Sequence, residues 1–455
     1  MYKSSNKIIV IGGNAAGPAA AAKAKRTNPN AEVILIEAGE FISTGTCELP
    51  YLISGEISDY NKIVYFNPES FYKAKGVRVF TKHFVKRIDT NKKVLEVIEK
   101  NTNRIVLFDF DKLILSTGSI ANEINELPFS LENVFSLKSV KDFIRIKNHI
   151  TPIKNGKVLV IGSGYIGLET AEAFKEIGYQ VSILDLEKLP MPAADEEVRY
   201  LIQDILTRNQ ISFLTSNEQS RFIIADNRFK QFKYEGRYID FDLAVVAAGV
   251  KPNIFLAKEA NLKLGKFGGL VVDSRLKTSN PNIYAAGDNI EIKNKITNRN
   301  DYIPLATFAH RHGHIAGENA AGGNLIAEPV FANSAFKLFN NFIAQVGLTT
   351  KQILMLNFNA QSVTAVVPNK VHVMPGSRKV FGKIIYDKNR KIILGASFIG
   401  GTEVAGYADL ISNMIYNKNS VLTLADMQFN YTPPLSPFVN LLSVLGRKVK
   451  ENIYG

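Results

Sequence analysis

Apolar residues gather in short runs at the start of the chain. Lys7–Ile11 is a β-branched run of the kind that forms a buried parallel strand. The glycine-rich segment Gly12–Gly17 follows, and the alanine-rich segment Ala19–Arg26 predicts a helix. Val33–Ile36 is a second apolar run, which ends at Glu37. This order predicts a strand–helix–strand unit with a glycine-rich turn after its first strand.

The same order of segments recurs further along the chain. A strand is predicted at Val158–Ile161, a helix at Leu168–Ile177 and a second strand at Val181–Leu184, which Asp185 follows. The turn between the first strand and the helix reads Gly162-Ser163-Gly164-Tyr165-Ile166-Gly167, a complete dinucleotide-binding fingerprint. A carboxylate at Asp185 can accept from a ribose 2′-hydroxyl and would repel a 2′-phosphate, so we expect NADH rather than NADPH.

The first fingerprint is imperfect. Gly12-Gly13-Asn14-Ala15-Ala16-Gly17 has Asn14 where the second glycine belongs, and a side chain there narrows the backbone's approach to a pyrophosphate. Glu37 nevertheless stands where a ribose ligand is expected. We therefore predict two dinucleotide sites.

After Phe331 the chain changes character. Alternating stretches at Lys379–Tyr386 and Lys391–Phe398 predict antiparallel strands, and Thr402–Asn417 and Val421–Met427 predict helical segments. These features indicate a separate α+β domain.

Composition narrows the class of protein. The chain has 455 residues, 46% of them hydrophobic and 21% charged, which is typical of a globular protein. The net charge of +13 comes from lysines scattered along the chain, as on a basic solvated surface. Met1–Asn6 leads into too short an apolar run for a signal peptide, and Leu243–Val250 is too short to span a membrane, so we expect a cytoplasmic protein.

The chain has one cysteine, Cys47, so neither an intrachain disulfide nor a multi-cysteine metal site can form within it. A lone cysteine is usually an inert small hydrophobe. This one lies in Ser43-Thr44-Gly45-Thr46-Cys47-Glu48-Leu49-Pro50-Tyr51. That segment, with the segments listed next, resembles the single-cysteine class of flavin-dependent disulfide reductases, which includes coenzyme A-disulfide reductases, persulfide reductases, NADH oxidases and NADH peroxidases. The further matching segments are Asp111–Ser119, Gly249–Asn253, Thr278–Asn289, Pro304–Ala306 and Tyr431–Pro434.

The resemblance implies a fold of the α/β class, with two Rossmann-like domains of the glutathione-reductase type and a C-terminal α+β dimerisation domain. We expect a split FAD-binding domain at 1–124 and 246–330, an NADH-binding domain at 125–245 and a dimerisation domain at 331–455. A homodimer is expected, because in this class the partner's C-terminal residues complete each site.

The resemblance also implies the cofactors, FAD and NADH, and the residues that act with them. Hydride would pass from NADH to the flavin, and electrons from there to Cys47, whose thiolate is the reactive form. Tyr165 resembles the aromatic residue that gates the nicotinamide pocket, Glu169 the acidic residue that positions the nicotinamide, and Asp288 a ligand of the flavin's ribityl chain. Cys47 and Tyr431 are the implied catalytic residues. The implied cofactor-binding residues are Gly12, Ala16, Gly17, Glu37, Thr117, Gly118, Gly162, Gly164, Tyr165, Ile166, Gly167, Glu169, Asp185, Gly249, Asp288, Pro304, Leu305 and Ala306.

The resemblance favours a disulfide or persulfide as the electron acceptor. Peroxidases and water-forming oxidases carry a histidine where this chain has Ala15. Arg26, Ser43 and Lys75 are the implied substrate-binding residues, and Lys25 and Lys73 are further cations that could hold an anionic substrate. The partners we expect are a small disulfide, persulfide or polysulfide and a second copy of the chain, with no nucleic acid and no membrane insertion.

Several residues depart from the family pattern near the substrate. Glu48 replaces a small residue after the cysteine, and its carboxylate would raise the thiol's pKa and repel an anionic substrate unless it points outward or pairs with a cation. Thr46 replaces an asparagine. Val373-Met374-Pro375-Gly376 lacks an expected tyrosine, and the segment after Pro434 is short. These changes leave coenzyme A itself open as a substrate.

Two alternatives to the disulfide reductase remain. One is an NADH oxidase or peroxidase that cycles Cys47 through a sulfenic acid. The other is a flavoprotein that acts mainly by binding a protein partner. His310, His312 and His314 form His-x-His-x-His, but residues two apart on a helix do not share a face, so we expect no metal site.

Overall fold

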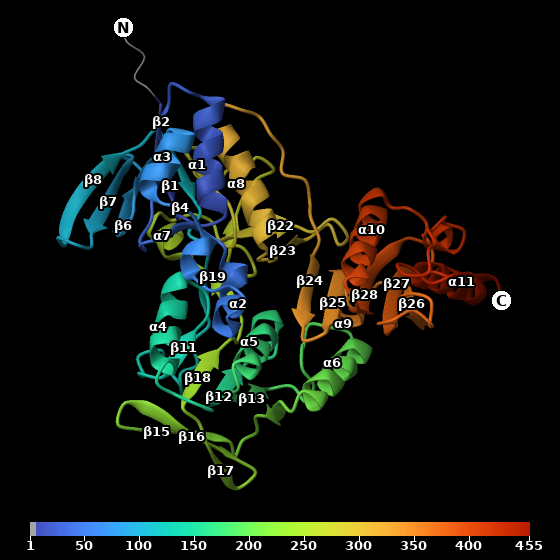
Figure 1. Cartoon of the computed structure of the whole chain (residues 1–455). Helices are drawn as coiled ribbons and strands as arrows, with labels where there is room; N and C mark the ends of the chain where they lie inside the picture. The colour runs from blue at the N-terminus through green and yellow to red at the C-terminus, as the bar shows by residue number, and fades with distance from the viewer. Residues whose placement is uncertain (1–5) are drawn as a thin grey trace. The chain divides into compact units, whose positions relative to one another are not determined.

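The computed structural model describes residues 6–455, so all of Met1–Asn6 except its last residue lies outside the described part. The described chain forms two compact units (Figure 1). The first comprises residues 6–122, Ser136–Asn148 and Gly249–Val330, and the second comprises Glu123–Phe135, His149–Ala248 and Phe331–Gly455.

A five-stranded sheet forms the centre of the first unit, and its paired strands all run parallel. The strands, in sheet order, are β21 (Ile283–Ala285), β9 (Lys112–Leu115), β1 (Lys7–Ile11), β2 (Glu32–Ile36) and β5 (Arg78–Phe80). Ile8, Ile9 and Val10 of the central strand are fully buried, which confirms the buried parallel strand predicted from the apolar run.

Two helices of the first unit pack closely, α1 (Ala16–Thr27) and α8 (Ala306–Ala320), which lie side by side (Figure 1). Their approach depends on two glycines of α8. A Cβ at Gly313 would overlap the carbonyl oxygen of Ala16, and one at Gly317 would overlap that of Ala20. Side chains at either position would therefore push α8 away from the helix that begins at the first fingerprint.

The other elements of the first unit surround this sheet. Two of them, β3 (Ile42–Thr44) and β4 (Val64–Phe66), form an antiparallel pair beside the short helix α2 (Leu49–Ser54). The rest are α3 (Pro68–Lys75), β6 (His83–Asp89), β7 (Val94–Glu99), β8 (Arg104–Asp109), β10 (Ser119–Ala121), β19 (Val250–Pro252), α7 (Phe255–Glu259), β20 (Leu270–Val271), β22 (Ile290–Lys293), β23 (Asn300–Asp301) and most of α4 (Val140–Ile150).

The second unit contains a sheet of the same design. In sheet order its strands are β11 (Val134–Ser136), β18 (Leu243–Val246), β12 (Lys157–Ile161), β13 (Gln180–Asp185) and β14 (Ser212–Thr215). Strand β12 is parallel to both neighbours, as β1 is in the first unit. Helices α5 (Tyr165–Glu176) and α6 (Glu196–Arg208) belong to this part, as does an antiparallel sheet of β15 (Arg221–Ala225), β16 (Arg228–Tyr234) and β17 (Arg237–Asp240). The two predicted Rossmann-like arrangements are thus confirmed.

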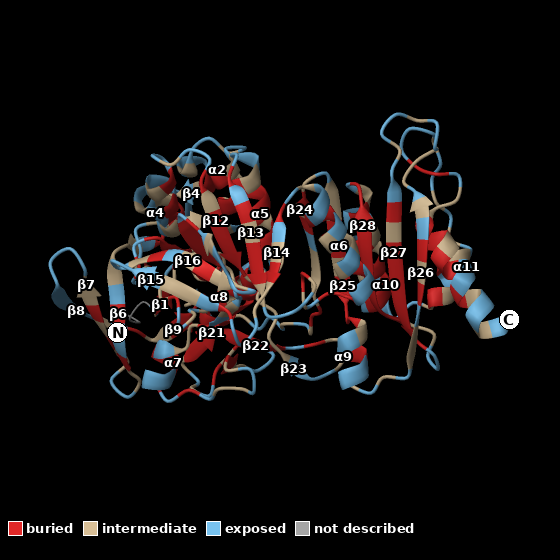
Figure 2. Cartoon of the chain, turned by 90° about the horizontal axis from the view of Figure 1, so that it is seen from below, coloured by how far each residue is buried: buried red, intermediate tan, exposed pale blue. Residues whose placement is uncertain are grey.

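An antiparallel five-stranded sheet makes up the C-terminal part of the second unit. Its strands, in sheet order, are β24 (Asn333–Leu338), β25 (Asn341–Gly347), β28 (Ile393–Gly400), β27 (Lys379–Asp387) and β26 (Ala360–Pro368). Strands β27 and β28 are mostly buried, as Figure 2 shows. The helical elements are α9 (Thr350–Met355), α10 (Glu403–Asn417), the 3-10 turn Val421–Ala425 and α11 (Leu441–Tyr454). The predicted α+β domain is confirmed.

The two faces of this sheet have different neighbours. A Cβ at Gly382 would press on Leu441 and Leu445 of α11. Lys383, the next residue, turns to the opposite face, where its Nζ lies 3.6 Å from Asp195 and 2.8 Å from Glu197 at the start of α6. Lys383 and Asp195 are almost completely buried, so this ion pair holds α6 to the sheet.

The two units do not coincide with the three predicted domains. The first unit is split near 122 and 249 and also takes residues 136–148, while the predicted NADH-binding and dimerisation domains share the second unit. The boundaries 1–124, 125–245, 246–330 and 331–455 stay a prediction. Within residues 6–455, no helix combines the length and apolar character that a membrane span requires.

Candidate active site

The first fingerprint forms a tight turn at the end of β1. Gly12 has a positive φ of 109°, and a Cβ at Gly17 would overlap the carbonyl oxygen of Gly12. The side chain of Asn14 is held toward Thr44, because its Oδ1 accepts from the Thr44 amide at 3.0 Å. The Ser43 amide in turn donates to the carbonyl of Gly13 at 2.8 Å. The departure from the glycine pattern thus ties the fingerprint to the segment that carries Cys47.

Glu37 lies at the end of β2, beside this turn. Its Oε2 accepts from the Gly13 amide at 2.6 Å and its Oε1 from the Gly39 amide at 2.5 Å. These bonds fix the carboxylate at the carboxyl edge of the parallel strands, which is where the ribose of a dinucleotide binds in such folds.

The second fingerprint repeats this construction. Gly162 has a φ of 98°, and a Cβ at Gly167 would overlap the Gly162 carbonyl. Asp185 at the end of β13 accepts from the Ser163 amide at 2.8 Å and the Ser163 hydroxyl at 2.5 Å. Its other oxygen accepts from the Glu187 amide at 3.1 Å. Asp185 thus matches Glu37 in position and in its backbone partner.

The geometry fits a dinucleotide at the second site. Gly164 has ordinary backbone angles, with φ −73° and ψ −172°, and a Cβ there would meet no protein atom within 4 Å. Neither conformation nor packing requires a glycine at this position. An approaching phosphate group does, because a side chain would fill the space in front of the helix α5 N-terminus.

Asp288 and Thr117 lie at the carboxyl edge of the first sheet. The Ser119 hydroxyl donates to Asp288 at 2.8 Å, the Thr117 hydroxyl donates to the Asn253 carbonyl at 2.8 Å, and the Asn289 side chain donates to the Leu115 carbonyl at 2.9 Å. A Cβ at Gly118 would meet no atom within 4 Å. The carboxylate, the hydroxyls and this open space fit a polar chain such as that of FAD.

The remaining first-site residues lie in two places. Pro304 and Leu305 precede α8, which begins at Ala306 and contacts the α1 residue Ala16 at Gly313. Gly249 has a φ of 83° and accepts at its carbonyl from the Asn122 amide at 3.0 Å. These residues all lie in the first unit, as do Gly12, Glu37 and Asp288.

Tyr165 opens α5 in the second unit. Its hydroxyl lies 2.9 Å from the Ser334 hydroxyl on β24, and its ring meets that of Phe336 edge-on at a centroid distance of 5.0 Å. Burial raises the pKa of Tyr165, so the phenol stays protonated. Ile166, the next residue, is exposed.

Glu169 lies one turn further along α5. Burial raises its pKa from the ordinary 4.5 to about 7, and the nearby Glu172 adds to the shift by like-charge repulsion. A carboxyl group with a pKa close to neutral can hold or release a proton under physiological conditions, which is a common property of functional residues.

Cys47 is exposed, in the 3-10 turn Thr46–Glu48 that leads into α2. The Gly45 amide donates to the Ile63 carbonyl at 2.8 Å, and β3 pairs with β4. These contacts fix the chain immediately before the turn. Ser43 precedes it with a positive φ of 51°. Helix α2 begins at Leu49, two residues after Cys47.

The predicted substrate-binding cations differ in what they contact. Arg26 is exposed in the last turn of α1. Lys75 lies over the Phe66 ring, with 5.7 Å from Nζ to the centroid. Lys25 donates to the carbonyls of Pro29 and Ala31, both at 2.8 Å, and Lys73 pairs with Glu69 at 2.7 Å. Arg26 and Lys75 are thus better placed than Lys25 or Lys73 to meet an anion.

Tyr431 lies in the second unit, between the 3-10 turn and α11. Its side chain is 49% exposed and its ring meets Phe438 edge-on at 5.4 Å. Phe438 is 81% exposed, so this aromatic pair presents an apolar surface that the rest of the chain leaves largely uncovered.

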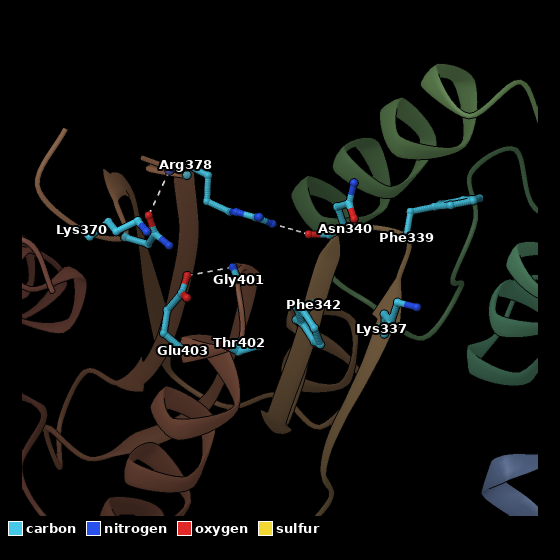
Figure 3. Close-up of a pocket in the computed structure, with 11 residues that line it drawn as sticks. Lys337, Phe339, Asn340, Phe342, Lys370, Arg378, Gly401, Thr402 and Glu403 are labelled. Atoms are coloured by element: carbon cyan, nitrogen blue, oxygen red, sulfur yellow. Dashed lines mark hydrogen bonds between the residues drawn. The ribbon is translucent and has the colours of Figure 1, made fainter. Parts of the chain in front are cut away.

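A pocket of about 290 Å³ in the C-terminal sheet contains none of the predicted site residues (Figure 3). Three cations line it, but Lys337 lies 3.2 Å from Glu172, and Arg378 donates to the Asn340 carbonyl. Glu403 accepts from the Gly401 amide at 2.8 Å and adds a negative charge to the pocket. Two of the three cations are therefore already engaged by protein groups, which leaves less positive charge for an anionic ligand.

The three histidines on α8 differ in burial: His312 is buried, His314 is half-buried and His310 is exposed. Burial lowers the pKa of His312 to about 4, while the rings of His310 and His314 are tilted relative to each other, with their centroids 4.9 Å apart. Within the described residues, no three His, Cys, Asp or Glu side chains are arranged to hold a metal ion.

Comparisons with known proteins show the family of the chain. The sequence profile of the pyridine nucleotide-disulphide oxidoreductases matches residues 6–313, and the profile of their dimerisation domain matches residues 334–441. The chain belongs to this family of oxidoreductases, which uses FAD and NAD(P)H. FAD and a nicotinamide cofactor are thus confirmed, and the preference for NADH over NADPH stays a prediction.

Three relatives show the range within the family. An NADH oxidase of Methanocaldococcus jannaschii is 30% identical, over 94% of this chain and 95% of its own. An NAD(P)H coenzyme A polysulfide/persulfide reductase of Pyrococcus horikoshii is 29% identical, over 98% of both chains. The crystal structure of reduced CoADR-RHD of Bacillus anthracis has a TM-score of 0.93 and 29% identity, and covers 99% of this chain and 81% of that one.

Two residues next to the predicted site could not be found from the sequence. Tyr65 donates to Glu48 beside Cys47, and Ser334 contacts Tyr165. Neither belongs to a motif, and each reaches the site through strand placement.

Proposed function

We propose that this protein is a reductase that uses FAD and NADH to reduce a low-molecular-weight disulfide or persulfide at Cys47. The observation that carries the proposal is the position of the only cysteine. It is exposed, and strand β3, which precedes its turn, is bonded to the first fingerprint through the amides of Ser43 and Thr44. The name of the P. horikoshii relative, a coenzyme A polysulfide/persulfide reductase, supports the same substrate class.

The residues of the two fingerprints have separate roles in this proposal. Gly12, Glu37 and Asp288 would hold FAD, and Gly164 and Asp185 would hold NADH. Bound FAD supplies two-electron redox chemistry between a nicotinamide and sulfur. Tyr165 lies within the second fingerprint and Glu169 follows it, both on α5, so they would position the nicotinamide ring.

Cys47 must exchange sulfur with an external partner, because the chain has no second cysteine. Its thiolate attacks one sulfur of the substrate disulfide, the S–S bond breaks, and one thiol leaves as a thiolate that takes up a proton. A mixed disulfide remains on Cys47. Two electrons from NADH oxidation and a second proton then return Cys47 to a thiolate and release the second thiol.

The dimerisation domain supports a homodimer, and we propose that Tyr431 acts at the partner's site. Tyr431 and Phe438 are exposed on their own chain, as residues that serve a second copy would be. Arg26, Ser43 and Lys75 would line the substrate approach in the first unit.

Anaerobic NADH oxidation by the purified holoenzyme tests the proposal. Coenzyme A disulfide, polysulfide and hydrogen peroxide are offered separately, and Cys47→Ser is the control. We expect turnover with a disulfide or polysulfide and its loss in Cys47→Ser. Turnover with peroxide alone would instead favour the activity named for the M. jannaschii NADH oxidase. Absence of cysteine-dependent turnover with every acceptor would overturn the proposal and leave protein binding as the alternative.

A further inference from the structure

Glu48 follows Cys47 directly, and the structure shows where its carboxylate lies. The side chain folds back over Gly45, whose Cβ position would be 2.6 Å from Oε1. Oε1 accepts from the Tyr65 hydroxyl at 3.0 Å. The carboxylate is therefore kept within the turn that presents the thiol.

Tyr65 reaches Glu48 because of the β3–β4 register. Thr44 pairs with Val64 and Ile42 pairs with Phe66, so Tyr65 lies between two fixed strand positions. The Gly45 amide also bonds the Ile63 carbonyl at 2.8 Å. The fold thus brings Tyr65 to Glu48 and restricts the directions that the carboxylate can take.

The partner of Glu48 is a neutral donor. The Glu48 hydrogen bond raises the pKa of Tyr65, and the negative charge at Cys47 raises it further, so the phenol stays protonated near neutral pH. Within residues 6–455, no lysine or arginine forms an ion pair with Glu48. Lys62 donates to Ser58 at 2.9 Å, and Lys73 pairs with Glu69. The charge of Glu48 therefore remains uncompensated beside the thiol.

We propose that Glu48, held in position by Tyr65, makes the Cys47 site select neutral or cationic disulfides over anionic ones. The inference rests on Cys47 being the reacting sulfur in the proposed function. An incoming disulfide places its substituents within a few ångströms of the residue next to Cys47. A carboxylate on the substrate would then meet that of Glu48, and at such distances near a protein surface the repulsion lowers the reaction rate by roughly three- to tenfold.

Alkylation of Cys47 tests this selection without turnover. Cys47 is the only cysteine, so iodoacetamide, which is neutral, and iodoacetate, which is anionic, report on one thiol. Both reagents consume the same thiolate, so a change in the thiol's pKa cancels in the ratio of their rates. We expect Glu48→Gln to lower the iodoacetamide-to-iodoacetate ratio by roughly three- to tenfold. Tyr65→Phe, which frees the carboxylate, should lower it by a smaller factor.

Glu69→Gln is the matched control, since it removes one exposed carboxylate of the same unit from α3. Its ratio should equal that of the unmodified protein. An unchanged ratio in Glu48→Gln, or an equal change in Glu69→Gln, would overturn the proposal.

Turnover with a charge series extends the test. Cystamine, 2-hydroxyethyl disulfide and dithiodiglycolate carry two positive charges, none and two negative charges. We expect kcat/KM to fall in that order, and Glu48→Gln to narrow the difference. Failure of all three as substrates, with the alkylation result as expected, would contradict the proposed function but not the charge selection. Turnover of all three with no effect of Glu48→Gln would contradict the selection alone.

Discussion

Replacing Glu169 by glutamine removes a carboxyl group whose ionisation the folded protein disfavours. Burial on α5, with a smaller contribution from Glu172, raises the pKa of Glu169 from 4.5 to about 7. The difference corresponds to about 3 kcal/mol of extra free energy for the ionised form in the folded state.

The sign of the pH effect follows from the raised pKa. Between pH 4.5 and 7 the folded protein holds a proton on Glu169 that the unfolded chain has lost, so this residue's contribution to stability declines as the pH rises. Glutamine does not titrate. The stability of Glu169→Gln relative to the unmodified protein should therefore increase by about 2–3 kcal/mol from pH 5 to pH 8.

Urea denaturation of the holoenzyme, followed by circular dichroism at pH 5, 6, 7 and 8, measures this difference. Glu126→Gln, at an exposed position of the same unit, is the control and should show no such trend. The pH profile of NADH oxidation gives a second readout, because an inflection close to pH 7 should disappear in Glu169→Gln. A stability difference that is the same at pH 5 and pH 8 would show that the pKa of Glu169 is not raised in the folded protein.

Three further predictions concern the second unit. Ser334→Ala should change the affinity for NADH, measured by calorimetry, and should have no further effect in a Tyr165→Phe background if it acts through the Tyr165 hydroxyl. Asp185→Asn keeps the hydrogen-bond acceptor but removes the charge, so the ratio of kcat/KM for NADH over NADPH should fall about tenfold. Lys383→Met leaves the Asp195 carboxylate buried without its cation and should lower the free energy of unfolding by about 3–5 kcal/mol, whereas adding Asp195→Asn should restore part of the loss.

Local sequence patterns predicted the two nucleotide-binding sheets well. Strands β1 and β12 are buried on both faces, so their apolar runs have no polar interruption. Except for Gly164, the fingerprint glycines after them are required by positive φ or by close packing. The sheets β6–β8 and β15–β17 were not predicted, because their strands mix exposed and buried positions without a clear period. Helix α11, with an apolar face packed on β26 and β27, was also missed.

The contacts around the site depended on tertiary structure. Glu48 and Tyr65 are 17 residues apart and meet through the β3–β4 register, and Tyr165 and Ser334 are 169 apart. The hydrogen bond of the Asn14 side chain could not be predicted from the sequence either. Its side chain was expected to narrow the phosphate approach, but it bonds the Thr44 amide. In each case the residue type determines which hydrogen bonds the side chain can form, whereas the tertiary structure determines which residue it bonds.

The mass of the intact protein tests most directly whether Cys47 is the redox-active sulfur. The holoenzyme is incubated anaerobically with cystamine, measured, and measured again after one equivalent of NADH. We expect an adduct of one half-cystamine on Cys47 that NADH removes, and no adduct in Cys47→Ser. An adduct that persists after NADH is oxidised, or NADH oxidation by a disulfide without Cys47, would contradict this expectation.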